Sequence, residues 1–320
     1  MTTPVVDSQP SPSLADALPG EIRLAHFSDI HLTVRRLGWT WRDLFSKRAT
    51  GWLNLKLFGR GARFREAPQV TEALMAELRS RPLDRLVFSG DASMMAFETE
   101  LAYAAEQLGV GRPDQAPGLA VPGNHDAYTR RAVRQGNFES YFAPWQVGER
   151  EGDETYPFAQ KVGEYWLIGV NSARPRIASW DASGRVGKPQ RQRLERLLSR
   201  LGPGRRILVT HYPLFTETGR LEPLVRRLRD WKEVLRIARE YDVALWLNGH
   251  RHRGYYLPAN EDLPFPLICV GSATQRNRWS YNEYRIQERN LRAIRRVFDP
   301  LARQYTDGGS FSLQLASAAD

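Results

Sequence analysis

The sequence has almost no cysteine and no long hydrophobic run. Its 320 residues include a single cysteine, Cys269, which excludes an internal disulfide and any zinc or iron–sulfur site built from several thiolates. No apolar stretch approaches the ~18 residues that a membrane-spanning helix requires. Residues 1–20, rich in Pro, Ser, Ala and Asp, lack the basic start and the apolar stretch of a secretory signal. We therefore expect a disordered tail over 1–20 and a cytoplasmic protein.

Positive charge is unevenly distributed along the chain. The formal net charge is +10, from 46 basic and 36 acidic residues. Residues 33–65 carry nine basic residues and one acid, Asp43, and so account for +8 of that charge. Because the remainder is nearly neutral, the composition argues against a nucleic-acid surface that extends over the whole protein.

Hydrophobic periodicity predicts an α/β protein. Residues 21–27, 66–79, 83–88 and 97–108 alternate between strand and helix patterns, which is typical of a parallel sheet. Further strands are expected over 119–121, 165–170, 206–210 and 243–247, and further helices over 189–201 and 231–240. The pattern becomes strand-rich and antiparallel after residue 253. No linker interrupts it, so we predict one domain over 21–300 with an insertion at 33–65, followed by a C-terminal tail over 301–320.

Five of the six histidines stand beside Asp, Asn or Gly at predicted strand ends or turns. The groups, in chain order, are Asp29-Ile30-His31, Gly90-Asp91, Gly123-Asn124-His125-Asp126, Thr210-His211 and Gly249-His250-Arg251-His252. The sixth histidine, His26, matches no motif, and we expect it in the core or behind the site. Scattered core histidines would not gather in this way.

The spacing within these groups suits metal binding. Residues i and i+2 of an extended strand point to the same side, so Asp29 and His31 can address one ion, as can His250 and His252. The glycines that precede the proposed ligands allow sharp turns and close approach of the backbone.

Seven residues qualify as metal ligands, which is too many for one tetrahedral ion. They are Asp29, His31, Asp91, Asn124, His211, His250 and His252. Carboxylate, amide and imidazole ligands without sulfur suit divalent Mn, Fe or Zn better than Ca. We therefore predict two divalent ions, with Asp91 as a carboxylate that can bridge them.

The five groups together resemble the signature of the metallophosphoesterase family, also called the calcineurin-like phosphoesterase family. The resemblance spans residues 29–252, and residues 270–274 and 280–282 are similar to its bacterial phosphodiesterase branch. It implies a four-layer α/β/β/α sandwich with two central β-sheets and the metals at the carboxyl ends of their strands. It also implies that Asp29, His31 and His252 hold one metal, that Asn124, His211 and His250 hold the other, and that Asp91 lies between them.

The resemblance further implies a phosphoric ester hydrolase whose nucleophile is a hydroxide that bridges the two metals. His125 resembles the family histidine that stabilises the transition state or protonates the leaving oxygen, and Asp126 is expected to orient its imidazole. The protein phosphatases of the family carry Glu where this chain has Asp126, and Asp-Arg-Gly soon after the Gly-Asp pair. Both departures favour a phosphodiesterase. A member of the fold kept as a non-catalytic, metal-binding scaffold is the alternative.

The insertion at 33–65 combines its charge with aromatic and aliphatic residues, such as Trp39, Trp41 and Trp52. Because it follows His31, it can overhang the site. Three hypotheses remain open: a lid packed on the domain, a contact with an anionic membrane surface or a lipid-linked substrate, and, least favoured, a nucleic-acid groove of a nuclease.

This arrangement is similar to that of the bacterial pyrophosphatases that cleave UDP-2,3-diacylglucosamine in lipid A synthesis, which makes a lipid-linked pyrophosphate an alternative to a small phosphodiester. The protein would then also lie peripherally on the inner membrane surface. Near His211, the arginines at 226, 227 and 229 could contact phosphate, although a solvated face is the favoured interpretation.

Overall fold

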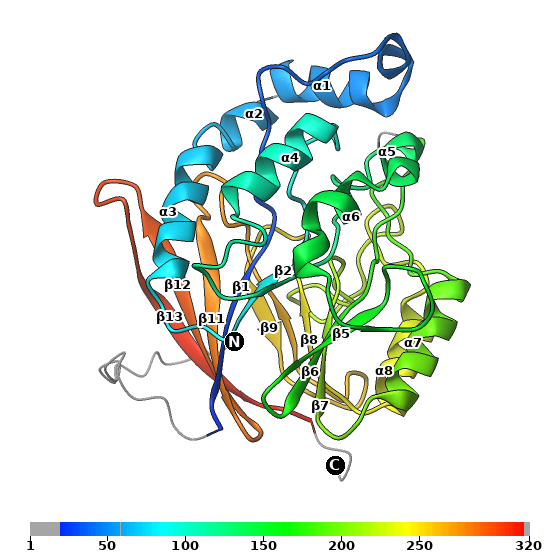
Figure 1. Cartoon of the computed structure of the whole chain (residues 1–320), viewed down its shortest axis with the longest axis vertical. Coiled ribbons are helices and arrows are strands. Elements are labelled where there is room, and N and C mark those ends of the chain that lie inside the picture. The colour runs from blue at the N-terminus through cyan, green and yellow to red at the C-terminus, as the bar shows by residue number, and fades with distance from the viewer. Residues whose placement is uncertain (1–19, 58, 179, 317–320) are drawn as a thin grey trace.

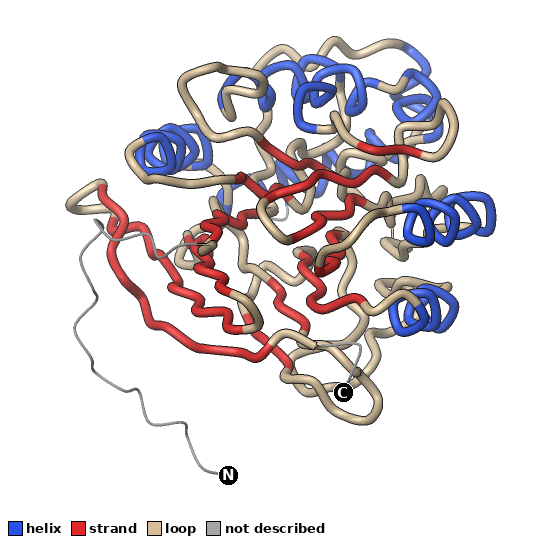
Figure 2. Tube along the Cα trace, turned by 60° about the horizontal axis from the view of Figure 1, so that its bottom comes forward, coloured by secondary structure: helices blue, strands red, loops and turns tan. Residues whose placement is uncertain are grey.

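Two β-sheets lie face to face with helices on both outer sides. The computed structural model describes residues 20–57, 59–178 and 180–316. One sheet has six strands in the order β13-β12-β11-β1-β2-β3, and the other has seven in the order β4-β5-β6-β7-β8-β10-β9. Figures 1 and 2 show this layering. The predicted four-layer α/β/β/α sandwich is confirmed.

The helices and strands are short, as is usual in a compact α/β domain. The strands are β1 (Ile22–Phe27), β2 (Arg85–Phe88), β3 (Gly118–Ala120), β4 (Glu149–Arg150), β5 (Phe158–Val162), β6 (Tyr165–Gly169), β7 (Arg205–Val209), β8 (Val243–Asn248), β9 (Tyr255–Leu257), β10 (Leu267–Cys269), β11 (Ser280–Gln287), β12 (Asn290–Asp299) and β13 (Gln304–Gln314). The helices are η1 (Trp41–Phe45), α1 (Lys47–Leu57), α2 (Arg60–Arg63), α3 (Ala67–Arg79), α4 (Glu98–Gln107), α5 (Arg130–Gln135), α6 (Asn137–Phe142), η2 (Ala143–Trp145), α7 (Lys188–Arg200) and α8 (Trp231–Glu240). Among the described residues, no helix combines the length and the apolar composition needed to span a bilayer.

Strand β1 shows why the layers form. All six of its residues are buried. Ala25 and Phe27 join the apolar cluster under α3, α4 and α6, whereas Ile22 and Leu24 join the cluster between the two sheets. A strand covered on both faces is apolar on both, which explains why this segment does not alternate strictly. A third cluster packs α7 and α8 on the outer face of the second sheet.

The C-terminal strands extend the first sheet beyond the predicted domain boundary. β11, β12 and β13 form antiparallel ladders, and β13 pairs with β12 from Asn290↔Gln314 to Asp299↔Gln304. This corrects the predicted tail over 301–320, since residues 304–314 belong to the sheet. β13 is an edge strand that buries few of its side chains, so its sequence has little strand pattern. The predicted tail over 1–20 falls almost wholly outside the described residues.

The parallel strands place the five histidine-containing groups together. β1, β2 and β3 run parallel in one sheet, and β6, β7, β8 and β10 run parallel in the other. The groups follow the carboxyl ends of β1, β2, β3, β7 and β8. In open α/β sheets, sites form at this edge of the strands.

Candidate metal centre

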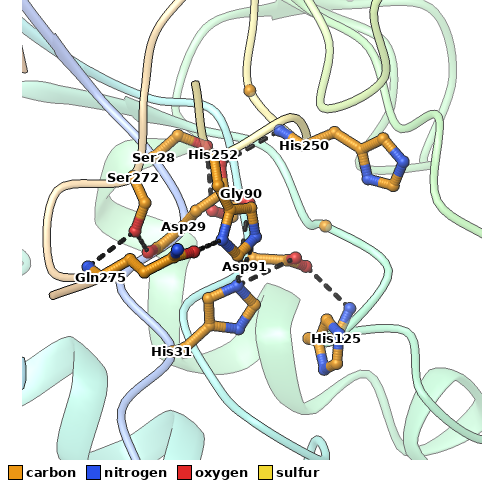
Figure 3. Close-up of polar contacts among 12 residues, drawn as sticks. Ser28, Asp29, His31, Gly90, Asp91, His125, His250, His252, Ser272 and Gln275 are labelled. Carbon is orange, nitrogen blue, oxygen red and sulfur yellow. Dashed lines mark hydrogen bonds and ion pairs between the residues drawn. The ribbon is translucent and has the colours of Figure 1, made fainter. Parts of the chain in front are cut away.

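One cluster of ligands joins residues from both sheets. Asp29, His31, Asp91 and His252 each offer an atom, and these atoms lie within 4.8 Å of one another. His252 Nε2 lies 3.0 Å from Asp29 Oδ1 and 3.1 Å from His31 Nε2. Figure 3 shows the imidazoles of His31 and His252 close to the carboxylates of Asp29 and Asp91. The family resemblance implied that three of these residues hold one metal and that Asp91 lies between the two metals.

A second cluster lies beside the first. The amide oxygen of Asn124 lies 2.9 Å from His250 Nδ1 and 3.2 Å from His211 Nε2. The two imidazole nitrogens are 3.3 Å apart. The structure therefore brings together the three residues that the family resemblance assigned to the other metal.

Asp91 joins the two clusters. Its Oδ2 lies 3.5 Å from His31 Nε2 in the first cluster and 3.5 Å from His211 Nε2 in the second. Its Oδ1 accepts a hydrogen bond of 2.7 Å from the backbone N–H of His125. A carboxylate in this position can bind one ion on each side, which is the arrangement of a two-metal site.

The backbone at five of these ligands is left-handed. The φ angles are 55° at Asp29, 46° at His31, 60° at Asp91, 73° at His250 and 55° at His252. The expected extended spacing is therefore wrong, because both pairs lie in turns beyond the strands and not within them. Left-handed residues on either side of a single intervening residue still direct both side chains to one point. Strained conformations of this kind concentrate at functional sites.

Two glycines are required by close approach of neighbouring groups. A Cβ at Gly123 would clash with the carboxylate and backbone of Asp91, and one at Gly249 would clash with the side chains of Ser28 and Asp29. Both segments could not approach so closely with any larger residue. This confirms the expectation that the glycines make room for the ligands.

Burial makes this set of residues costly without a cation. Burial and the charges of Asp29 and Asp126 raise the pKa of Asp91 well above its ordinary value. Burial would also raise the pKa of Asp29, but the nearby His252 and His31 lower it well below its usual range. Burial and the neighbouring His211 lower the pKa of His250, which keeps this imidazole in the neutral form that binds metal. Carboxylate, amide and neutral imidazole donors that converge in a buried site fit divalent cations.

His125 has the surroundings expected of a residue that acts on substrate. Its Nδ1 lies 2.6 Å from the carbonyl oxygen of Met94, to which it donates, and its ring lies 4.8 Å from that of His31. The side chain lines the cavity above the ligands. The hydrogen bond to Met94 fixes the orientation of the ring and places the proton on Nδ1.

The carboxylate of Asp126, which was predicted to orient the His125 imidazole, is hydrogen-bonded to backbone groups and to Ser93. It accepts hydrogen bonds from the backbone N–H groups of Ala92, Ser93 and Gly123, at 3.1, 2.9 and 3.0 Å, and from the Ser93 hydroxyl. It therefore joins the loop after Asp91 to the turn that carries Asn124.

Other residues that orient the ligands were missed by the sequence analysis. Gln275 Oε1 lies 2.5 Å from His252 Nδ1, and the carbonyl oxygen of Ser89 lies 2.8 Å from His211 Nδ1. Such partners fix the tautomer of a metal-binding histidine. A backbone carbonyl leaves no signal in sequence, whereas Gln275 directly follows residues 270–274, which the resemblance had included. His26 is a buried core histidine that contacts Tyr284 and Ser89, as expected.

A cavity of about 500 Å³ opens above the ligands. The insertion contributes Asn54, Arg63 and Phe64 to its lining, so this segment does overhang the site. Other segments contribute Arg226, Arg251 and Arg278. Arg226 therefore lines the cavity, whereas the sequence analysis favoured a solvated face for the loop that carries it.

A family model described as calcineurin-like phosphoesterase matches residues 22–254. No curated protein sequence matches the chain.

Solved structures share the fold at low sequence identity. A dimetal phosphatase from Danio rerio is 11% identical with a TM-score of 0.62, and the alignment covers 92% of this chain and 99% of that one. The purple acid phosphatase PPD1 from yellow lupin is 14% identical with a TM-score of 0.57, covering 94% and 55%. GAP50, described as the anchor in the inner membrane complex of Plasmodium, is 11% identical with a TM-score of 0.53, covering 93% and 90%.

Proposed function

Because the chain belongs to the calcineurin-like phosphoesterase family, we propose that it is a hydrolase of phosphodiesters that works with two divalent metal ions. The observation that carries the proposal is the position of Asp91, whose Oδ2 is equidistant from a histidine of each ligand cluster at 3.5 Å. Asp29, His31 and His252 are the proposed ligands of one ion, and Asn124, His211 and His250 of the other. The donor types favour Mn, Fe or Zn.

The ions, when bound, would lower the pKa of a water molecule and neutralise charge on the phosphate. The chain's own contribution begins with His125, which lines the cavity and is held by the carbonyl of Met94. In the protonated ring, the proton on Nδ1 stays in this hydrogen bond, so the proton on Nε2 is the one given to the leaving oxygen. Loss of that proton restores the neutral imidazole.

The choice of a diester over a monoester rests on motifs. Asp126 stands where the family's protein phosphatases carry Glu, and this chain continues Asp91-Ala92-Ser93-Met94-Met95 where they carry Asp-Arg-Gly after the Gly-Asp pair. Asp126 contacts the backbone of this same loop. The two departures therefore meet in one place in the structure, beside Asp91.

The first experiment measures metal content and substrate preference in the purified protein. We expect about two Mn ions per chain after loading, and hydrolysis of bis(p-nitrophenyl) phosphate faster than of p-nitrophenyl phosphate. Cyclic AMP and single-stranded DNA belong in the same screen, because DNA cleavage would favour a nuclease. One bound ion or none, with no hydrolysis, would favour a non-catalytic scaffold instead.

The second experiment separates metal binding from chemistry. His125→Ala should keep both ions and lower kcat by roughly 10²–10⁴, because it removes a proton donor and no ligand. Asp91→Asn should lose metal, because an amide has one ligand oxygen where the carboxylate has two. Release of the ions by His125→Ala would contradict the division of roles proposed here.

A second candidate function is cleavage of a diphosphate ester, such as UDP-2,3-diacylglucosamine. Three cavity arginines favour it, namely Arg63, Arg226 and Arg278, and within the described part of the chain no carboxylate pairs with them. Burial and the positive charges of Arg253 and Arg63 lower the pKa of Arg278. These arginines repel one another because no described carboxylate is paired with them. A substrate that carries more negative charge than one diester would reduce this repulsion.

The test compares the two substrate classes. Arg278→Ala and Arg226→Ala should lower kcat/KM for UDP-2,3-diacylglucosamine by about tenfold or more relative to kcat/KM for bis(p-nitrophenyl) phosphate. Arg65→Ala is the control, since Arg65 is an exposed arginine that does not line the cavity. Equal losses on both substrates would refute a second phosphate subsite without refuting the diesterase.

A further inference from the structure

Large apolar side chains are exposed along the insertion. Trp41 is 69% exposed, Phe45 is 88% exposed and Leu57 is 69% exposed. Leu44, Trp52 and Leu53 are also exposed. Six such side chains lie within 17 residues of η1 and α1, whereas exposed apolar residues on a protein surface are normally scattered singly. We call these six residues the apolar face of the insertion.

The two sides of α1 are reversed relative to an ordinary surface helix. Arg48, Gly51 and Leu55 follow helical spacing on the inner side, where Arg48 is buried and Leu55 packs against the core. Trp52, Leu53, Lys56 and Leu57 occupy the outer side, and all four are exposed. A helix on a soluble domain normally directs its polar side outward. Here the outward side is the more apolar one.

The insertion packs firmly on the domain. The exposure of these apolar side chains is therefore not caused by a loosely packed segment. Arg48 donates to Asp43 at 2.8 Å, to the carbonyls of Met95 and Ala96, and lies 3.9 Å above the ring of Phe97. Trp39 packs on Phe97 with ring centroids 5.1 Å apart. Trp39 therefore belongs to the attachment of the insertion and not to its outer surface.

The exposed charged residues of the insertion itself are all positive among those that the structure describes. Asp43, the single acid of residues 33–65, is buried in its ion pair with Arg48. The exposed cations of the insertion include Arg35, Arg36, Arg42 and Lys56, and the guanidinium of Arg42 lies 5.3 Å from the ring centroid of Trp41. Exposed tryptophan, phenylalanine and leucine in a segment whose exposed charge is positive are complementary to the acyl boundary and the head groups of an anionic bilayer.

A neighbouring loop carries a further exposed aromatic residue. The ammonium group of Lys47 in α1 lies 3.5 Å from the carbonyl oxygen of Asp181. Trp180, next to it in the chain, is 77% exposed. Figure 1 shows α1 at the end of the molecule farthest from the C-terminus, outside α3 and α4. Nothing in the described fold covers this end.

We infer that the apolar face of the insertion docks the protein on an anionic lipid surface, with Trp41, Phe45 and Leu57 entering the head-group layer. The same insertion lines the cavity through Asn54, Arg63 and Phe64, so the docked protein would hold its candidate metal centre near the membrane. This inference concerns the surface and does not depend on which phosphoric ester is hydrolysed.

The test is sedimentation of the metal-loaded protein with vesicles. The protein should pellet with vesicles of phosphatidylcholine and phosphatidylglycerol, and added salt should weaken the binding. The combined variant Trp41→Ser, Phe45→Ser and Leu57→Ser should lower the partition coefficient about tenfold or more, while it retains metal and hydrolysis of bis(p-nitrophenyl) phosphate. Arg42→Gln with Lys56→Gln should weaken binding to the anionic vesicles.

The matched control is Val147→Ser with Leu301→Ser, since both residues are exposed apolar side chains outside the insertion. It should bind the vesicles as the parent protein does. Absence of vesicle binding by the parent, or equal binding to pure phosphatidylcholine, would overturn the inference. Dimerisation in solution that the triple variant abolishes would overturn it too, because the face would then be an interface between two copies of the chain.

Discussion

Glu100 provides a test of the electrostatics at the base of the insertion. This residue of α4 is buried, and burial raises the pKa of its carboxyl group from 4.5 to about 7. The Thr33 hydroxyl donates to Oε1 at 2.6 Å, and the N–H groups of Met95 and Phe97 donate to Oε2 at 2.9 and 3.2 Å. These hydrogen bonds and the charge of Arg48 lower the pKa, but they offset only part of the increase that burial causes.

The sign of the effect follows from proton binding in the two states. Between pH 4.5 and about 7, the unfolded chain releases the Glu100 proton while the folded protein keeps it. The contribution of this group to the free energy of unfolding therefore falls as pH rises through that window and is constant above it. The difference of about 2.5 pH units corresponds to about 3 kcal/mol.

Glu100→Gln is the perturbation, because glutamine has the shape of the protonated acid and its NH₂ can donate to Thr33. Arg48 keeps a counter-ion in this variant, since it is paired with Asp43. Urea unfolding from pH 4.5 to 8 should show that the variant becomes more stable than the parent by about 3 kcal/mol over this range. Glu106→Gln, at an exposed position of the same helix, is the control. Parallel pH profiles for Glu100→Gln and the parent would refute the reasoning.

Three further predictions concern the surroundings of the site. Burial lowers the pKa of His26 from 6.5 to about 3, so the free energy of unfolding should be about 2 kcal/mol lower at pH 5 than at pH 7. His26→Gln should remove this difference. Gln275→Ala should weaken metal affinity by about 10–100-fold in a chelator titration, because His252 loses the partner of its Nδ1. Asp126→Asn should lower the free energy of unfolding by about 2 kcal/mol, because an NH₂ group would face backbone donors. If Asp126→Asn changes the pH profile of kcat and leaves stability unchanged, then Asp126 does act through His125.

The sequence predicted the fold best where strands are buried on both faces. β1 and β8 are buried throughout and largely apolar, because each lies between a helical layer and the opposite sheet. The helices α5 and α6 were missed, since each has six residues, too few for a helical period to show. Phe142 of α6 packs on Phe88 through contacts distant in the sequence. β13 was also missed, because its sequence lacks a strand pattern. It forms a strand through its hydrogen bonds to β12, which the sequence does not show.

The candidate site was predicted from residue types in their order along the chain, and the structure brings all seven proposed ligands together. The geometry of the site could not be predicted as well as its residues. The extended spacing of Asp29 and His31 was wrong because a turn follows β1, and the hydrogen bonds of Asp126 go to backbone atoms that no pattern specifies. In the insertion, the sequence could not distinguish Trp39, which packs on Phe97, from Trp41, which is exposed.

The left-handed backbone at Asp29, His31, Asp91, His250 and His252 affects how any substitution at these ligands should be interpreted. Asp, Asn and His are the residues other than Gly that best tolerate this conformation, and they are also hard and borderline metal ligands. Alanine at such a position would remove a ligand and add backbone strain, whereas glycine would remove the ligand and relieve strain. Comparing the two replacements at one position, in metal-free protein, separates the cost of the lost ligand from that of the turn that presents it. A stabilised glycine variant without metal would mean that the fold maintains these five residues at the expense of its own stability, on the order of 1 kcal/mol each.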